Sequence, residues 1–410
     1  MVRVIYNERF ALLTDYPFER LRALLEGITP PPSPPVVMSI GEPQHPPPPF
    51  VRDLLDASSA LWGRYPPMNG TPEFRVAATD WLTRRFALPA GFLDPDRHVL
   101  PVAGTREALY LIAHLVVPRR KGSARPTVLI PNPFYQVYVG AAVMAGAEPV
   151  YVPSGRQSGF LPDFTLFDPK ILQRTPYDPD TLNRTALAFL CTPANPQGSV
   201  ADLEYLKQAI TLARRYDFVL AVDECYSEIY DSIPPPGVLH ACADLGGDLT
   251  NVVVFHSLSK RSSVPGLRSG FVAGDPDIIA AFARLRAYGG AATPLPVMAA
   301  ATALWQDEVH VAENRTLYRA KMTAAERLLG GRFGLCRPAG TFFLWLKVGD
   351  GEATARALFQ KAGIRVLPGA YLARPDSTGV NPGRHYIRVA LVHDLDTTVW
   401  ALERLRDILG

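Results

Sequence analysis

Short apolar runs alternate with amphipathic stretches through the middle of the chain. Six runs have the length of strands, at 98–103, 127–131, 186–192, 218–223, 252–256 and 269–273. Several are apolar at every position, as parallel strands are when helices cover both faces of their sheet. Between them Leu109, Ile112, Ala113 and Val116 recur with helical spacing. The alternation predicts an α/β fold in which a large, doubly wound domain contains a mostly parallel sheet.

The pattern changes after residue 295, where a long helical region precedes strand candidates at 340–348 and 385–391 and a final helix. This order is typical of a smaller α+β domain. We expect residues 1–49 to form an arm that also contributes to the small domain, 50–294 to form the large domain, and 295–410 to form the small C-terminal domain.

Composition and charge exclude several classes of protein. The chain has 410 residues, of which 48% are hydrophobic, enough for a sizeable buried core. Its net charge of +3 gives no reason to expect nucleic acid or a membrane surface as a partner. The long uncharged runs at 126–147 and 287–306 are interrupted by prolines, so neither predicts a membrane span.

The four cysteines indicate the compartment. No two form a CxxC pair, and none has the spacing of a zinc site with the histidines. We therefore expect no metal ion. Four cysteines in 410 residues are too few for a disulfide framework, which predicts a location in the reducing cytoplasm.

The sequence VVVFHSLSKRSSVPGLRSGFVAG carries the strongest local feature. Its apolar strand leads into a turn with Ser257, Ser259 and Lys260, and Arg268 follows Lys260 by eight positions. A lysine at the end of a buried strand is poorly solvated, which lowers its pKa and makes it a candidate Schiff-base nucleophile. The alternative is an ordinary exposed loop lysine.

Candidate site residues also lie at or just after the ends of the two preceding strand candidates. Asp223 ends an apolar strand, where a carboxylate needs a cationic partner. That partner is either a protonated pyridine nitrogen or an arginine. Tyr226 places a phenol three residues further on, beside the same site. Asn195, in the sequence NPQG, is either a plain turn residue or an amide donor to a ring oxygen.

Two further features could bind anions. Gly104 and Thr105 stand between a strand and a helix start, where backbone N–H groups can hold a phosphate, although a plain turn explains them equally well. Arg388, on a strand near the C-terminus, is the natural partner of a carboxylate. Taken alone, it would more readily be read as a structural salt-bridge arginine.

Together these features resemble the class I and II aminotransferases, a family of fold-type I enzymes that use pyridoxal 5′-phosphate. The order of the motifs matches over essentially the whole chain. Asp223 follows Asn195 by 28 positions, Lys260 follows Asp223 by 37, and Arg388 follows Lys260 by 128.

The resemblance implies a role for each residue at the cofactor. Lys260 would carry the cofactor covalently and move the substrate proton, and Asp223 would keep the pyridine nitrogen protonated. Asn195 and Tyr226 would bind the ring hydroxyl, and Tyr135 would stack on the ring. The phosphate would be bound by Gly104, Thr105, Arg106, Ser257 and Arg268.

The resemblance also implies a homodimer with shared active sites, because Tyr65 would reach the phosphate in the partner subunit. On the substrate side, Arg388 would bind the α-carboxylate, with Asn195 and Gly41 beside it. The expected partners are thus a small amino donor, a keto acceptor and a second copy of the chain.

Within the family, segments such as SIGEPQHPPP, PNPFYQVY and DECYSEIY resemble the N-succinyldiaminopimelate aminotransferases of lysine and diaminopimelate biosynthesis. This implies amino transfer between glutamate/2-oxoglutarate and N-succinyl-LL-2,6-diaminopimelate/N-succinyl-2-amino-6-oxopimelate. The succinylated product has three carboxylates, so its binding pocket would need cations besides Arg388. Sequence position offers four candidates, any of which could instead be an ordinary surface arginine: Arg20, Arg22, Arg261 and Arg384.

Three other functions stay open. The chain could transaminate acetylornithine, aspartate or alanine, or act as a C–S β-lyase with the same Lys260 and Asp223. A non-enzymatic effector-binding module is disfavoured, because the sequence has no basic block for DNA.

Overall fold

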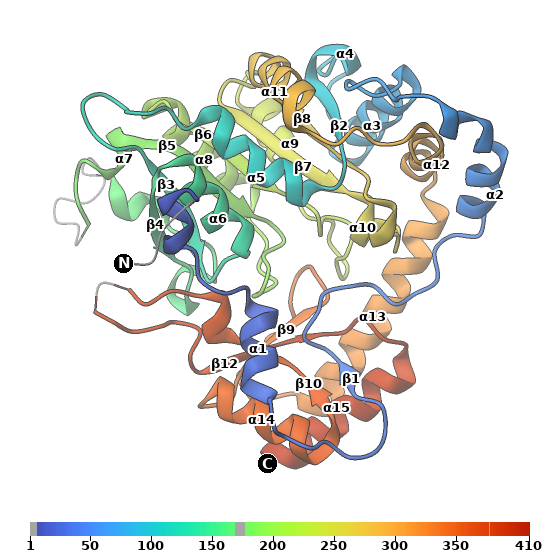
Figure 1. Ribbon diagram of the computed structural model, residues 1–410, viewed down its shortest axis with the longest axis vertical. Coiled ribbons are helices and arrows are strands. Elements are labelled where there is room, and N and C mark those ends of the chain that lie inside the picture. Colours follow the sequence, from blue (N-terminus) through green and yellow to red (C-terminus); the bar gives the residue numbers. More distant parts are fainter. Residues whose placement is uncertain (1–5, 169–176, 377) are drawn as a thin grey trace.

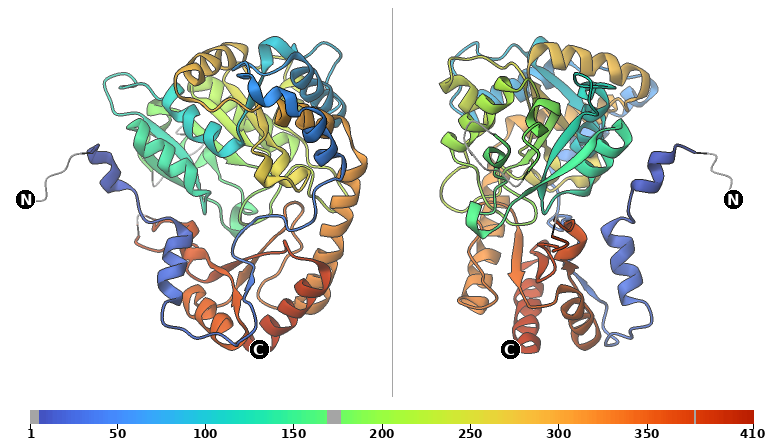
Figure 2. Two further views of the ribbon diagram at one scale, coloured as in Figure 1. Left: turned by 45° about the vertical axis from the view of Figure 1, so that its right-hand side comes forward. Right: turned by 90° about the vertical axis from the view of Figure 1, so that its left-hand side faces the viewer.

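The computed structural model describes residues 6–168, 177–376 and 378–410. The first five residues of the expected arm therefore lie outside the described part of the chain. Figure 1 shows a large sheet with its helices above and a smaller group of helices and strands below. The long helix α13 (Val309–Leu329) runs between the two parts, and both views in Figure 2 show the N-terminal segment projecting at the edge of the molecule.

The large sheet has seven strands. Their order across the sheet is β2 (Val99–Val102), β8 (Gly270–Gly274), β7 (Val252–Ser257), β6 (Val219–Asp223), β5 (Thr185–Cys191), β3 (Thr127–Asn132) and β4 (Glu148–Pro153). Only β8 runs in the opposite direction to the other six strands, so the sheet is mostly parallel as predicted. The six predicted strands of this domain are all confirmed.

Helices cover both faces of this sheet, which explains why its strands are apolar at every position. On β3, Leu129 faces one hydrophobic core while Val128 and Ile130 face the other. Burying a large apolar side chain contributes about 1.5–3 kcal/mol, so both faces stabilise the sheet. The first core is closed by α3 (Pro72–Arg85), α8 (Leu203–Arg215), α9 (Val238–Asp244) and α12 (Leu295–Gln306), and the second by α5 (Thr105–Val116), α6 (Gln136–Ala145) and α11 (Pro276–Gly289).

The smaller part is built on a three-stranded antiparallel sheet. Its order is β11 (Leu367–Pro368), β12 (Tyr386–Ala390) and β9 (Phe343–Lys347). A second, two-stranded sheet pairs β1 (Val36–Val37) with β10 (Ile364–Arg365) in parallel. A hydrophobic core joins this part to α1 (Pro17–Leu25), α13, α14 (Gly351–Ala362) and α15 (Leu395–Leu409).

The domain boundary at residue 294 stays a prediction. Helix α12 begins at Leu295, yet it packs against α2 (Phe50–Ala57) and α3 and contributes Trp305 to the core of the large sheet. The remaining helices are short: α4 (Pro95–His98), α7 (Thr181–Arg184), α10 (Leu258–Arg261) and the 3-10 helices Glu8–Leu12, Ser59–Gly63, Arg156–Ser158, Phe164–Phe167, Pro265–Leu267 and Gly369–Leu372.

Two sequence runs raised the question of a membrane segment. Residues 126–147 form β3, a turn and α6, and residues 287–306 form the end of α11, a loop and the buried helix α12. Within the described residues, no helix combines the length and the apolar character that crossing a membrane requires.

Candidate active site

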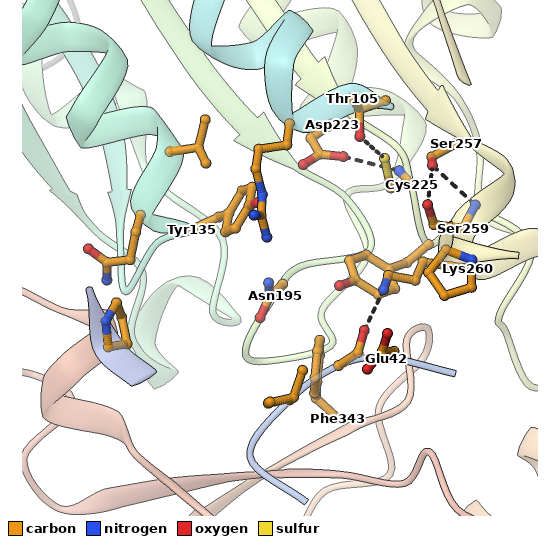
Figure 3. A pocket seen from close by; sticks show the side chains of 18 of the residues that line it. Glu42, Thr105, Tyr135, Asn195, Asp223, Cys225, Ser257, Ser259, Lys260 and Phe343 are labelled. Atoms are coloured by element: carbon orange, nitrogen blue, oxygen red, sulfur yellow. Dashed lines mark hydrogen bonds between the residues drawn. The ribbon is translucent and has the colours of Figure 1, made fainter. Parts of the chain in front are cut away.

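A cavity of about 930 Å³ lies beside the carboxyl ends of the parallel strands, where α/β sheets commonly bind ligands. Both parts of the fold line it: Asp223 ends β6, Ser257 ends β7, and Arg388 comes from β12 of the small sheet. Eleven of the thirteen predicted site residues line the cavity, namely Gly41, Thr105, Arg106, Tyr135, Asn195, Asp223, Tyr226, Ser257, Lys260, Arg268 and Arg388. Figure 3 shows several of them facing the same space.

Lys260 lies on the short helix α10, immediately after β7. Its Nζ donates a hydrogen bond to the backbone carbonyl of Gly41. Burial lowers the pKa of Lys260 to about 8, so a substantial fraction of the amine is neutral near physiological pH. The side chain is therefore suited to act as a nucleophile and as a base, rather than as the solvated loop lysine of the alternative interpretation.

Asp223 is buried, with 5% of its surface exposed. Its Oδ2 accepts from Tyr138 Oη at 2.8 Å, and its Oδ1 accepts from the backbone N–H of Cys225 at 3.2 Å. Burial raises the pKa of this carboxyl. No lysine or arginine in the described ranges pairs with it, so the arginine alternative is not what the structure shows. A protonated ring nitrogen fits the position.

A group of potential anion-binding groups, the phosphate cradle, lies at the start of α5. Gly104 has φ +80°, and a Cβ there would lie 2.0 Å from Arg268 Nη2. Arg268 is held by the carbonyls of Pro265, at 3.0 Å, and Ala103, at 3.4 Å. The guanidinium and the free N–H groups of the helix start thus converge where only glycine fits, and Ser257 lies nearby in the cavity wall. These groups fit a phosphate.

Arg388 is 5% exposed and binds two parts of the site at once. Its Nη1 donates to Asn195 Oδ1 at 2.9 Å, and its Nη2 donates to the carbonyl of Ser39 at 2.7 Å. Burial lowers its pKa to about 10, which leaves the guanidinium charged at neutral pH. Because Asn195 Oδ1 accepts from Arg388, its Nδ2 is the donor left for a ring oxygen.

The aromatic residues enclose the site from two sides. Arg106 Nε donates to Tyr135 Oη at 2.8 Å, so the Arg106 side chain holds this ring, while its backbone remains at the start of α5. Tyr226 is buried edge-on against Phe342 and Phe343, and burial raises the pKa of its hydroxyl well above the usual value. The phenol therefore stays protonated and can donate a hydrogen bond.

Two predicted residues do not line the cavity. Gly104 lies behind it, in contact with Arg268, which fits a backbone role. Tyr65 is fully exposed, with a relative exposure of 101%, and lies outside the cavity of its own chain. Its position tests nothing about a partner subunit, so its contact with the partner's phosphate stays a prediction.

The four arginines considered for further carboxylates do not line the cavity either. Arg20 lies over the Tyr371 ring, and Arg22 pairs with Glu19 on the surface of α1. Arg261 is buried but donates to the Leu304 carbonyl and to Glu308. Arg384 is exposed in the loop before β12. None of the four therefore reaches this cavity, and the alternative of an ordinary surface arginine fits Arg22 and Arg384, both of which are exposed.

A hydrogen-bonded network behind Lys260 was missed from the sequence. Lys321 Nζ lies 2.7 Å from His45 Nε2 and donates to two carbonyl groups that follow β12, at 2.9 and 2.6 Å. His45 Nδ1 lies 3.1 Å from Asn314 Oδ1, and Asn314 Nδ2 donates to the Lys260 carbonyl at 3.1 Å. Because Asn314 Nδ2 is the donor to Lys260, its Oδ1 accepts, and the proton of a neutral His45 therefore sits on Nδ1. The network fixes the Gly41–His45 segment against the backbone of Lys260.

Comparison with known proteins agrees with this geometry. Residues 33–405 match the model of the family described as aminotransferase class I and II. The LL-diaminopimelate aminotransferase of Desulforudis audaxviator is 31% identical over 384 residues, which are 92% of this chain and 90% of that relative.

Solved structures give the same result. An aminotransferase of Neisseria meningitidis is 42% identical, with a TM-score of 0.91 over 99% of this chain and 100% of that one. A probable N-succinyldiaminopimelate aminotransferase of Thermus thermophilus is 24% identical, with a TM-score of 0.78 over 98% and 100%. The latter likeness concerns the fold alone.

Proposed function

Because the chain belongs to the class I and II aminotransferases, we propose that it moves an amino group between a diaminopimelate-type amino acid and 2-oxoglutarate. Enzymes of this family use pyridoxal 5′-phosphate. When bound, this cofactor supplies an electron sink for the bond that breaks at the substrate Cα. The observation that carries the proposal is the placement of Arg388 and Asn195 in one cavity with the amine of Lys260.

Each residue has a task in this reaction. Arg388 binds the substrate α-carboxylate through two parallel hydrogen bonds, with Gly41 beside it. With the cofactor bound, Lys260 would take the proton from the substrate Cα and pass it to the former aldehyde carbon of the cofactor, as suits a base with a pKa of about 8. Asp223 keeps the ring nitrogen of the cofactor protonated, and Tyr226 and Asn195 donate to the ring oxygen.

The relatives support the choice of substrate class. Several curated relatives at 30–31% identity are named LL-diaminopimelate aminotransferase. The sequence segments quoted above favour the N-succinylated form instead. Both substrates have an α-amino acid that would face Arg388, and the same carbon chain joins it to a charged distal end. The same amino transfer is therefore possible with either one.

Steady-state kinetics test the proposal. The holoenzyme is assayed with 2-oxoglutarate and with LL-diaminopimelate, N-succinyl-LL-diaminopimelate, acetylornithine, aspartate or alanine as donor. We expect the highest kcat/KM with one of the two diaminopimelates. A higher value with any of the other donors would refute the substrate class. Release of pyruvate and ammonia from cystathionine without a keto acceptor would instead support the β-lyase.

We further propose a cytoplasmic homodimer in which Tyr65 completes the phosphate site of the partner subunit. The full exposure of Tyr65 supports this role. Mixing inactive Lys260→Ala and Tyr65→Ala proteins tests it, since a hybrid dimer would contain one intact shared site. We expect activity to reappear after subunit exchange, and two inactive proteins that stay inactive would argue against shared sites.

A further inference from the structure

The charges around the cavity leave one carboxylate without a task. Arg268 and the start of α5 form the phosphate cradle, Asp223 holds the ring nitrogen, and Arg388 faces the α-carboxylate. Glu107 also lines the cavity, but its Oε1 accepts the backbone N–H of Ala291 at 3.0 Å. The side chain of Glu42 remains, and within the described ranges it has neither a hydrogen bond nor an ion pair.

Glu42 lies on a fixed segment next to the amine of Lys260, and its side chain is exposed in the cavity. It follows Gly41, whose carbonyl accepts the hydrogen bond from Lys260. The segment that carries it is held by the bond from the Gln44 N–H to the Val392 carbonyl, at 3.1 Å, and by His45. Figure 3 shows Glu42 on the same side of the cavity as Lys260 and Phe343. The charge of Glu42 also acts to raise the pKa of Lys260, against the larger effect of burial.

We infer that Glu42 binds the distal ammonium group of a diamino acid whose α-carboxylate is bound by Arg388. This inference rests on the proposed function and selects between its two substrates. At its distal end unmodified LL-diaminopimelate has an ammonium beside a carboxylate, whereas the N-succinylated form has an amide there and two carboxylates. A free carboxylate attracts the first and repels the second. The absence of the four candidate arginines from the cavity favours the same substrate.

The binding test uses two probes that cannot undergo transamination at Cα. Hexanoate and 6-aminohexanoate share the carboxylate and chain length, and they differ only in the distal ammonium. Calorimetric titration of the holoenzyme measures both dissociation constants. We expect 6-aminohexanoate to bind about two- to fivefold more tightly than hexanoate, as for a partly exposed ion pair. In Glu42→Gln this ratio falls to about one, while hexanoate binding stays the same.

Two variants control for other effects of the charge. Glu26→Gln removes a surface carboxylate at the end of α1, outside the cavity, and is expected to keep the wild-type ratio. Glu42→Asp keeps the charge and is expected to restore part of the preference. If Glu42→Gln keeps the full preference for 6-aminohexanoate, the inference is overturned. The inference is also overturned if the substitution shifts the pH at which the visible spectrum of the holoenzyme changes but leaves the ratio of the two dissociation constants unchanged.

Kinetics separate this inference from the proposed function. In Glu42→Gln, kcat/KM for LL-diaminopimelate is expected to fall about fivefold, and that for the N-succinylated form to stay constant or rise. A wild-type preference for the succinylated form that survives this substitution overturns the inference alone. If the wild type accepts neither diaminopimelate, the proposed function fails, and the calorimetric ratio still decides whether Glu42 binds a distal ammonium.

Discussion

Arg388 and Asn195, which lie 193 positions apart in the chain, are joined by a hydrogen bond of 2.9 Å from Arg388 Nη1 to Asn195 Oδ1. The sequence resemblance assigns Arg388 to the substrate carboxylate, and Asn195 both to the cofactor ring and to the substrate. The structure shows that Arg388 also orients the amide of Asn195. The two residues are therefore expected to act as one unit.

The first prediction concerns this coupling. Arg388→Ala removes a buried cation and frees Asn195, so kcat/KM for amino donors is expected to fall at least about 30-fold, corresponding to the lower end of 2–5 kcal/mol for such truncations. Asn195→Ala alone costs less. In the double variant, kcat/KM is expected to fall by less than the product of the two single losses, because Asn195 is already released in Arg388→Ala. Additive losses in this double-mutant cycle would show that the two residues act independently.

A second prediction follows from the pKa of Lys260, which burial lowers from its ordinary value to about 8. Only the neutral amine attacks an aldehyde, so the rate at which the cofactor-free protein takes up pyridoxal 5′-phosphate should rise with pH and level off above about pH 8. An unperturbed lysine would keep gaining rate up to about pH 10.4. Stopped-flow absorbance measures this profile. Lys260→Arg keeps the charge and should show no covalent uptake, and a profile still rising well above pH 8 would contradict the lowered pKa.

The sequence predicted the position of a site residue where the local apolar pattern and the chemistry of the residue agree. The strand that ends at Asp223 and the turn that carries Lys260 each combine an apolar run with a functional residue at its end, and both lie where they were predicted. Strand β4, at the edge of the sheet beside β3, was missed because Pro149 and Pro153 interrupt it and only one of its six residues is fully buried. Proline is tolerated at such an edge, so the usual pattern is lost.

Long-range side-chain contacts could not be predicted in the same way. His45 and Lys321 are 276 positions apart, and although His45 lies in the matched segment SIGEPQHPPP, nothing in that segment indicates a contact with Lys321. Glu42 sits in a matched segment, but nothing in the sequence indicates that its carboxylate lacks a partner. The direction of a side chain depends on packing between the two parts of the fold, which is why Arg261 reaches Glu308 instead of the cavity.

Gly104 supports a third prediction, about cofactor affinity. An alanine Cβ there would lie 2.0 Å from Arg268 Nη2 and would displace the guanidinium from the phosphate cradle. We expect Gly104→Ala to weaken the binding of pyridoxal 5′-phosphate by at least about tenfold, since each 1.4 kcal/mol lost is a factor of ten. Gly91→Ala is the matched control, because Gly91 has φ +73° and open space around its Cβ position. Equal cofactor affinities of the two variants would rule out the clash as the cause.

The last prediction concerns Lys321, which is 1% exposed and whose pKa burial lowers to about 7, with Asp394 acting weakly in the opposite direction. An unfolded lysine titrates near pH 10.4, so between about pH 7 and pH 10 the unfolded chain binds more protons at this site than the folded chain. Stability contributed by this site must then rise with pH in that window and stay constant below it.

Lys321→Met removes the titrating group and isolates this effect. The free energies of unfolding of both proteins are measured with urea. Above pH 7 we expect the value of the wild type minus that of the variant to increase by at most about 1.4 kcal/mol per pH unit. Lys347→Met, at the exposed end of β9, should leave the pH dependence unchanged. A difference between wild type and Lys321→Met that is constant from about pH 6 to about pH 10 would mean that the contacts to His45 and to the two carbonyl groups keep the pKa of Lys321 near its ordinary value.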